Sequence, residues 1–309
     1  MPLFGDAGTI VLTAGFVATA CAVLGVLLVL RGISLLGDAV SHSILPGIIA
    51  VFLITGSRAP IVVILGAAMI AVACVLAIEW LQSTGLVRSD AAIGLVFPAL
   101  FALGVLGVHR YTADVHIDLD STIYGEIAFV PFRVLDIAGV DVAGGLIVAV
   151  VVALVDVVVV ALLWKEFKAT GFDPGFAQVA GFAPRWIARL LLVLVSITAV
   201  MAFESVGAIL VIALLIVPAA TARLVTERLL AMVMLAIAIG WLAAIGGYLG
   251  AVSTDSSIAG AMGVVATVAF VVALAVSPRH GLIARARRRR PRRGASRDMG
   301  TTGAGPVGG

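Results

Sequence analysis

The sequence contains an uninterrupted apolar run, GTIVLTAGFVATACAVLGVLLVL, at residues 8–30. A helix needs about 20 apolar residues to cross the hydrocarbon core of a bilayer, and this run is long enough. Similar runs recur along the chain, because 62% of the 309 residues are hydrophobic and only 12% are charged. This composition excludes a water-soluble globular domain and predicts a polytopic membrane protein.

The apolar runs predict an all-α fold, because a helix satisfies every backbone N–H and C=O group without water. We expect eight or nine transmembrane helices. The count depends on residues 188–218, which form either one long tilted helix or two helices separated at Glu204, Ser205 and Gly207. The predicted spans are residues 8–30, 36–55, 60–81, 91–108, 134–163, 188–203, 205–218, 229–250 and 257–276.

Positive charge is concentrated near the C-terminus, where nine of the 20 Lys and Arg residues lie beyond Ser277. The charge therefore belongs to a tail and does not indicate a nucleic-acid surface. Because cytoplasmic segments collect Lys and Arg, this tail predicts a cytoplasmic C-terminus. Nine spans would then put the N-terminus outside, and a re-entrant segment near residues 109–133 would reverse it. We expect residues 1–277 to form the membrane domain and residues 278–309 a disordered, Gly-rich tail near anionic lipid.

Two ionisable side chains inside a predicted span form the first candidate site. Asp38 and His42, in the segment GDAVSH at residues 37–42, lie one turn apart on the same face of a helix. A carboxylate and an imidazole suit manganese, zinc or iron(II). The same spacing also suits a hydrogen bond that packs two helices without an ion. Ionisable groups within spans are costly, which makes this pair a candidate for a transport path.

Polar residues also gather after the fourth predicted span. His116, Asp118 and Asp120 alternate with apolar residues, which would place them on one side of an extended strand. There they would pass a cation inward or, alternatively, belong to a solvated loop. Glu204, beside the predicted helix break, is a further candidate, with gating favoured over metal binding.

The sequence lacks the phosphate-binding loop of P-loop ATPases, the nucleophile elbow of serine hydrolases and the HExxH motif of zinc proteases. These absences disfavour an enzyme, and ATP-driven transport would need a separate ATPase subunit. Two polar segments predicted on the inside suit docking of such a subunit, the first as a short helix on the membrane surface. Their candidate docking residues are Ala219, Thr221, Arg223, Glu227 and Arg228 in the first segment, and Phe172, Asp173 and Pro174 in the second.

Four motifs follow one another along most of the chain: RGISLLGDAVSHSILPG at residues 31–47, WKEFK with FDP within 164–174, VGAILVIALLIVPAATAR at 206–223, and SPRHG at 277–281. In this order and spacing, the chain resembles the permease subunits of the manganese/zinc/iron ABC importer family. One departure is DSSIAG at residues 255–260, where family members often carry Asp-x-Pro-Thr-Gly. Asp255 is expected to be a helix N-cap instead.

The resemblance implies a permease, not an enzyme, in the plasma membrane of a prokaryote, working as a homodimer or with a similar second permease. Two cytoplasmic ATPase subunits would bind ATP and drive alternating access, and an extracytoplasmic lipoprotein would supply a divalent metal ion. No cofactor is permanently bound on this reading. By likeness, manganese is favoured over zinc and iron, Asp38 and His42 are the transient metal site, and residues 219–228 are preferred over residues 165–185 for ATPase coupling.

Two other functions stay open on the sequence. A proton-coupled secondary metal carrier would use Asp38, Glu204 and Asp156 as proton relays. An intramembrane enzyme would use Asp38 with Ser41 and His42, although no oxyanion arrangement accompanies them. ATP-dependent uptake separates the importer from both.

Overall fold

The computed structural model describes residues 5–33, 36–55, 60–111, 127–137 and 140–277. Its regular elements are almost all helices, as the apolar composition predicts. Their bounds are α1 (Gly5–Arg31), α2 (Leu36–Thr55), α3 (Pro60–Ser83), α4 (Ser89–Tyr111), η1 (Ile127–Phe132), β1 (Val134–Ile137), β2 (Val140–Ala143), α6 (Gly144–Leu162), α7 (Trp164–Phe172), α8 (Pro174–Val179), α9 (Pro184–Val206), α10 (Ala208–Val225), α11 (Leu229–Thr254) and α12 (Ile258–Val276).

Six helices in the described part of the chain are long and apolar enough to cross a membrane, namely α1, α3, α6, α9, α11 and α12. Helices α4 and α10 contain shorter apolar stretches. Each of these eight helices overlaps a predicted span, and α2 overlaps the remaining one. A polytopic helical membrane protein is therefore confirmed, whereas the count of eight or nine spans stays a prediction.

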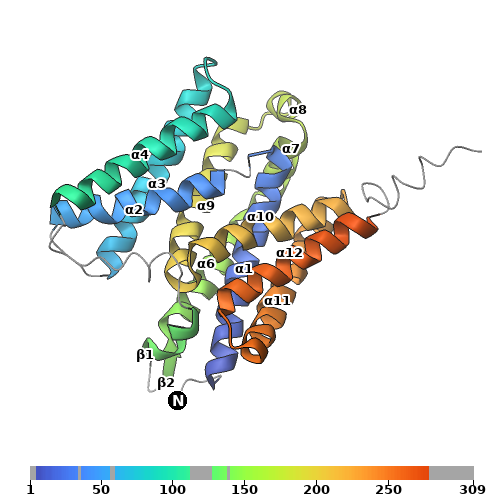
Figure 1. Ribbon diagram of the computed structural model, residues 1–309. Coiled ribbons are helices and arrows are strands. Elements are labelled where there is room, and N and C mark those ends of the chain that lie inside the picture. Colours follow the sequence, from blue (N-terminus) through green and yellow to red (C-terminus); the bar gives the residue numbers. More distant parts are fainter. Residues whose placement is uncertain (1–4, 34–35, 56–59, 112–126, 138–139, 278–309) are drawn as a thin grey trace, which may run out of the picture.

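Helix α1 lies in the middle of the molecule and contacts α6, α9, α10 and α11 (Figure 1). Its membrane-spanning stretch is 78% buried inside the protein, against 11% for that of α12. Helices α2, α3 and α4 pack together on one side of this centre, and α11 and α12 pack together on the other. The hydrophobic core of the protein is therefore built around α1.

Small residues allow α1 to approach its neighbours closely. A Cβ atom at Gly25 would overlap the main-chain oxygen of Leu215 in α10. At Gly15 the same atom would lie 2.6 Å from the ring of Trp241 in α11, and that ring donates a hydrogen bond from Nε1 to Thr19 Oγ1 over 3.1 Å. Close packing of this kind is how helices associate in a membrane, where lipid tails are as apolar as leucine.

The predicted break near residue 205 is confirmed. Helix α9 ends at Val206 and α10 begins at Ala208, with Gly207 between them at φ 83° and ψ 161°. Side chains of L-amino acids rarely adopt this backbone conformation, so only glycine suits it. Residues 188–218 thus form two helices and not one tilted helix.

The prediction of one span over residues 134–163 is wrong at its start. Strand β1 pairs antiparallel with β2, Val134 opposite Ala143 and Ile137 opposite Val140, and α6 begins only at Gly144. The two strands are rich in β-branched residues, which favour strands, and the pairing places Asp136 opposite Asp141. A hairpin at the end of the molecule also keeps two aspartates out of the membrane.

The expected N-cap at Asp255 is also wrong, by two residues. Asp255 ends α11 in the left-handed region, at φ 50°. The residue that caps α12 is Ser257, whose hydroxyl accepts a hydrogen bond from the Gly260 N–H group over 3.3 Å. Asp255, Ser256 and Ser257 are all residue types that cap helices well. The turn between α11 and α12 places the last of them, Ser257, at the cap position.

We predict that Gly25→Val destabilises the protein by about 1–3 kcal/mol, because the added side chain must push α1 away from α10. Thermal unfolding in detergent, followed by tryptophan fluorescence, measures the change. Gly263→Val is the matched control, since a Cβ at Gly263 in α12 meets nothing within 4 Å. Equal melting temperatures for the two variants would contradict this account of the α1–α10 contact.

Candidate functional site

Helix α2 carries the first predicted pair. Asp38 and His42 lie in its first two turns, one turn apart along one face. Their side chains fall outside what the structure describes, but the adjacent stripe of α2 is packed inside the protein, where Ala39 and Ser43 are fully buried. The helix contacts α3, α4, α9 and α10. The pair therefore lies on a helix that packs against four others.

The remaining predicted metal ligands cannot be placed by their side chains. His116, Asp118 and Asp120 lie within residues 112–126, outside the described residues. Glu204 lies in the last turn of α9, where the backbone alone is described. Among the side chains that the structure does describe, no three His, Cys, Asp or Glu residues converge as a metal site.

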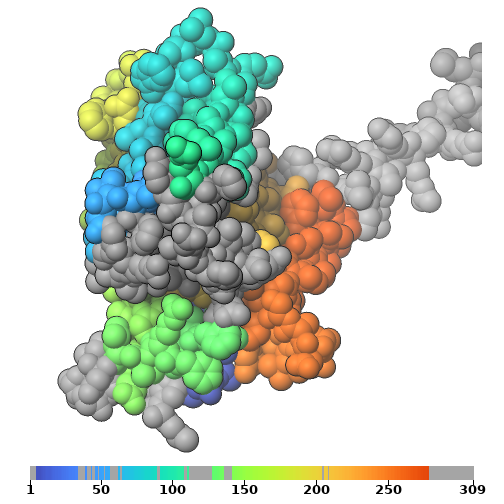
Figure 2. Space-filling view, turned by 60° about the vertical axis from the view of Figure 1, so that its left-hand side comes forward, coloured from blue at the N-terminus to red at the C-terminus, as the bar shows by residue number. Residues whose placement is uncertain are grey.

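The two ends of the molecule differ in charge. The N-terminal end of α1 and the β1–β2 hairpin lie at one end, and α7 and α8 lie at the other (Figure 1). Figure 2 shows the α3–α4 region and the hairpin at opposite ends of the surface. The end with α7 and α8 also carries Arg31, Lys165, Lys168, Arg185 and Arg189.

At this basic end, hydrogen bonds join helices that are distant in sequence. Arg31 Nη2 donates to Thr170 Oγ1 in α7 over 2.8 Å. Arg223 Nη1, from α10, donates to the Val29 carbonyl oxygen in α1 over 2.7 Å. Beyond α12, the Ser277 hydroxyl donates to the Leu224 carbonyl oxygen over 2.6 Å. The C-terminal ends of α1, α10 and α12 are thus fastened together, with α7 attached to α1.

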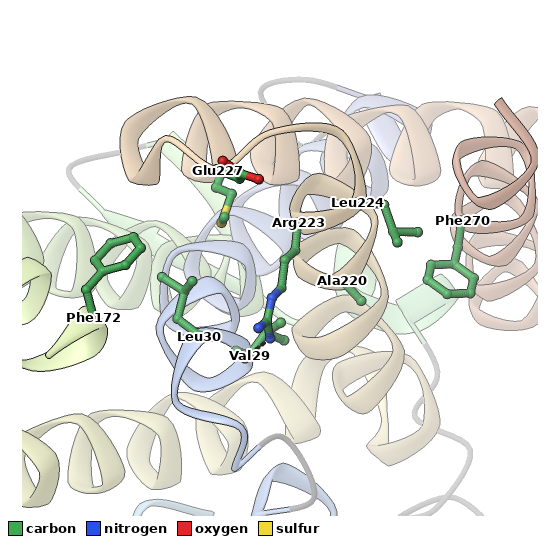
Figure 3. A pocket seen from close by; sticks show the side chains of 9 residues that line it. Val29, Leu30, Phe172, Ala220, Arg223, Leu224, Glu227 and Phe270 are labelled. Carbon is green, nitrogen blue, oxygen red and sulfur yellow. Dashed lines mark hydrogen bonds between the residues drawn. The ribbon is translucent and has the colours of Figure 1, made fainter. Parts of the chain in front are cut away.

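A pocket of about 620 Å³ lies between these helix ends. In Figure 3 the Arg223 side chain reaches down toward Val29, whereas Glu227 lies above Arg223, and Phe172 and Phe270 lie at the two sides. The other walls of the pocket are mainly apolar and come from α1, α7, α10, α11 and α12. The lining residues are Val29, Leu30, Phe172, Ala220, Arg223, Leu224, Glu227, Met232 and Phe270.

The short surface helix predicted after Pro218 does not exist as a separate element. Helix α10 continues through Pro218 to Val225. Ala219 is fully buried and Thr221 is 3% exposed, with its hydroxyl bonded to the Val217 carbonyl oxygen within α10. These two residues line the interior of the bundle and present no surface to a partner. The exposed residues of the predicted segment come later, at Arg223, Val225, Glu227 and Arg228.

The second predicted docking segment forms two short helices with an exposed apolar surface. Helix α7 ends at Phe172, and Asp173 caps α8, where its Oδ1 accepts from the Phe176 N–H group over 2.9 Å. Pro174 occupies the first turn of α8, where its missing N–H is no loss. Phe172, Phe176 and Val179 are 54%, 65% and 88% exposed. The opposite face holds α7 and α8 on the bundle through the buried residues Phe167, Thr170 and Ala177.

A buried carboxyl group lies between α6 and α9. Asp156 is 1% exposed, and its Oδ2 accepts a hydrogen bond from Thr198 Oγ1 over 2.7 Å. From the sequence, Asp156 is considered only as a proton relay of the alternative carrier, and its hydrogen-bond partner lies 42 residues away on another helix. The pair fastens α6 to α9 inside the membrane region.

Residues 8–277 match the family model described as the ABC 3 transport family. The chain belongs to this family. It is 42% identical over 277 residues to the manganese transport system membrane protein MntD of Bacillus subtilis, covering 89% of this chain and 93% of that one. It is 44% identical over 276 residues to the zinc transport system membrane protein TroD of Treponema pallidum, covering 89% and 75%. The solved structure of PsaBC from Streptococcus pneumoniae in complex with Fab matches with a TM-score of 0.72 at 26% identity, covering 88% and 92%.

Membership of the ABC 3 transport family confirms the resemblance drawn from the four motifs. The match extends from the start of α1 to the end of α12, so it includes both the Asp38–His42 helix and the α7–α8 surface. This ABC 3 family chain is thus a membrane subunit of an ABC transporter, in agreement with a transport role and not an enzymatic one.

We predict that Thr198→Val lowers the stability of the protein by about 1–3 kcal/mol, because Asp156 loses its hydrogen-bond donor inside the bundle. The measurement is the melting temperature in detergent. Ser196→Ala serves as the control, since the Ser196 hydroxyl is buried on the same helix but bonds only to the Leu192 carbonyl oxygen of its own turn. A loss no greater than that of the control would show that the pair contributes nothing.

Proposed function

We propose that the chain is the permease subunit of an ATP-driven importer for a divalent transition metal, with manganese as the first candidate and zinc or iron as the others. The observation that carries the proposal is the alignment over 89% of the chain with relatives named for manganese and zinc transport. The permease lies in the plasma membrane of a prokaryote and pairs with a second permease subunit. An extracytoplasmic metal-binding lipoprotein delivers the ion.

Asp38 and His42 form the transient metal site on the transport path. A carboxylate and an imidazole bind manganese, zinc or iron(II), and two protein ligands completed by water hold an ion weakly enough for release. Helix α2 packs against α9 and α10, the two helices joined at the Gly207 break. We therefore assign Glu204, at the end of α9, to gating of the same path. His116, Asp118 and Asp120 are assigned to ion entry on the outer side.

The basic end of the molecule faces the cytoplasm, and the ATPase subunit docks there on α7 and α8. Lys and Arg on α7 and α9 favour the cytoplasmic side, and the basic tail follows Ser277 at the same end. Docking needs exposed apolar anchors on a rigid support, and Phe172, Phe176 and Val179 supply them. We therefore prefer this segment over residues 219–228, whose Ala219 and Thr221 are buried. ATP binds and is hydrolysed on the partner.

The test is uptake of radioactive manganese and zinc by proteoliposomes that contain the permease with its ATPase and binding protein. We expect uptake that requires ATP and falls about tenfold or more in His42→Ala and Asp38→Asn, because each variant removes one metal ligand. The control is Thr267→Val on α12, whose exposed hydroxyl bonds only to the Gly263 carbonyl oxygen.

Normal uptake by both Asp38→Asn and His42→Ala would show that the metal site does not lie on α2. Uptake by the permease alone, driven by a pH gradient in vesicles without ATPase, would support the proton-coupled carrier. Loss of uptake counts toward the metal site only if each variant still binds the ATPase.

A second test concerns docking. We expect Phe176→Asp to weaken binding of the ATPase about tenfold or more, because a charge would replace an apolar anchor in the interface. Binding is measured by titration of the detergent-solubilised permease with its ATPase. Phe132→Asp is the control, because Phe132 is 71% exposed in η1, beside the hairpin at the opposite end. Loss of binding in Glu227→Arg with none in Phe176→Asp would return the docking site to residues 219–228.

A further inference from the structure

We propose that the hydrogen bond between Arg31 and Thr170 is a positioning contact that transmits movement of the ATPase-docking helices to the helix that carries Asp38 and His42. The inference rests on the proposed function and deepens it. It assigns a role in energy coupling to two residues that touch neither the metal nor the ATPase.

The Thr170 hydroxyl is fully used in this contact. Thr170 is 3% exposed, and its Oγ1 donates to the Glu166 carbonyl oxygen over 2.7 Å while it accepts from Arg31 Nη2 over 2.8 Å. A hydrogen bond from a charged donor is stronger than one between neutral groups. The buried face of α7 is therefore held to the end of α1 by a directional contact and not by apolar packing alone.

The docking surface and Thr170 belong to one rigid segment. Only Asp173 separates α7 from α8, and it closes the junction as the cap of α8. Thr170 lies three residues before this cap, on the side of α7 opposite the exposed Phe172. A force applied to the apolar surface by a docked subunit thus reaches Thr170 without crossing a flexible linker.

The receiving end of the contact is equally firm. Helix α1 ends in a Schellman motif, with Gly32 at φ 70°, the Gly32 N–H bonded to the Val29 carbonyl oxygen over 3.3 Å and the Ile33 N–H to the Leu28 carbonyl oxygen over 3.2 Å. Arg223 bonds to the same Val29 oxygen. Because hydrogen bonds hold this end in place, a displacement of Arg31 displaces the end of α1, and α2, which carries Asp38, begins at Leu36.

An acceptor on α7 supports a second position for that helix. Glu166 Oε2 is buried and has no hydrogen-bond partner among the described residues. Buried polar atoms are seldom left unsatisfied, and each exception calls for a physical reason. An element that alternates between two arrangements supplies such a reason, because a shift of α7 would bring this oxygen to a donor or to water.

The experiment compares Thr170→Val with wild type in the complex of permease, ATPase and binding protein. Valine keeps the branched shape of threonine but can neither accept from Arg31 nor donate to Glu166. We expect ATPase binding and ATP hydrolysis to persist, and the manganese taken up per ATP hydrolysed to fall about tenfold. Thr170→Ser should restore the ratio. Thr13→Val is the control, since Thr13 is a buried α1 residue whose hydroxyl bonds only to the Thr9 carbonyl oxygen.

A normal ratio of uptake to hydrolysis in Thr170→Val would overturn the inference and leave the proposed function intact. Loss of ATPase binding in this variant would also overturn it, because the contact would then only shape the docking surface. If wild type shows no ATP-dependent uptake, the proposed function fails first. If Thr170→Val unfolds, Arg31→Lys is used instead, and the manganese taken up per ATP hydrolysed is measured in the same way. Lysine keeps the positive charge of Arg31 but not its planar fork of donors, so the ratio is again expected to fall.

Discussion

The close contact of α1 with α10 and α11 is the constraint on which the rest of the structure depends. In lipid, apolar surface alone gives helices no reason to associate, so they need backbone proximity and matched shapes. Gly25 and Gly15 provide both, one against the Leu215 oxygen and the other against the Trp241 ring. Around this centre the other helices take positions that fix α2 on one side and α12 on the other (Figure 1).

The same packing brings distant polar groups to one end of the molecule. Arg31, Arg223 and Ser277 come from three different parts of the chain, yet each makes a hydrogen bond at the basic end. These three bonds use a main-chain oxygen or a threonine hydroxyl and not a carboxylate, so they fix geometry without neutralising the charges of Arg31 and Arg223. The basic end can therefore be both rigid and positively charged, which suits a surface where another subunit exerts force.

Sequence reasoning located the helices and the Gly207 break because hydropathy and glycine act locally. It failed where a local pattern had two solutions: residues 134–143 are mostly apolar and read as a span, but Val134–Ile137 and Val140–Ala143 pair as a hairpin. Polar residues after Pro218 suggested a surface helix, whereas tertiary packing buries Ala219 and Thr221. Partners such as Thr198 for Asp156 depend on which helices meet, and spacing within one segment does not reveal that.

The central place of α1 has a consequence for biosynthesis. Helix α1 is synthesised before the other described helices, but the groups that match it come much later, and Trp241 lies 222 residues beyond Thr19. Until α11 has entered the membrane, the Gly15 and Thr19 face of α1 meets lipid or a temporary neighbour. The final bundle can therefore close only after most of the chain has been inserted, and truncation in the last third would leave α1 with α6 and α9 but without α11.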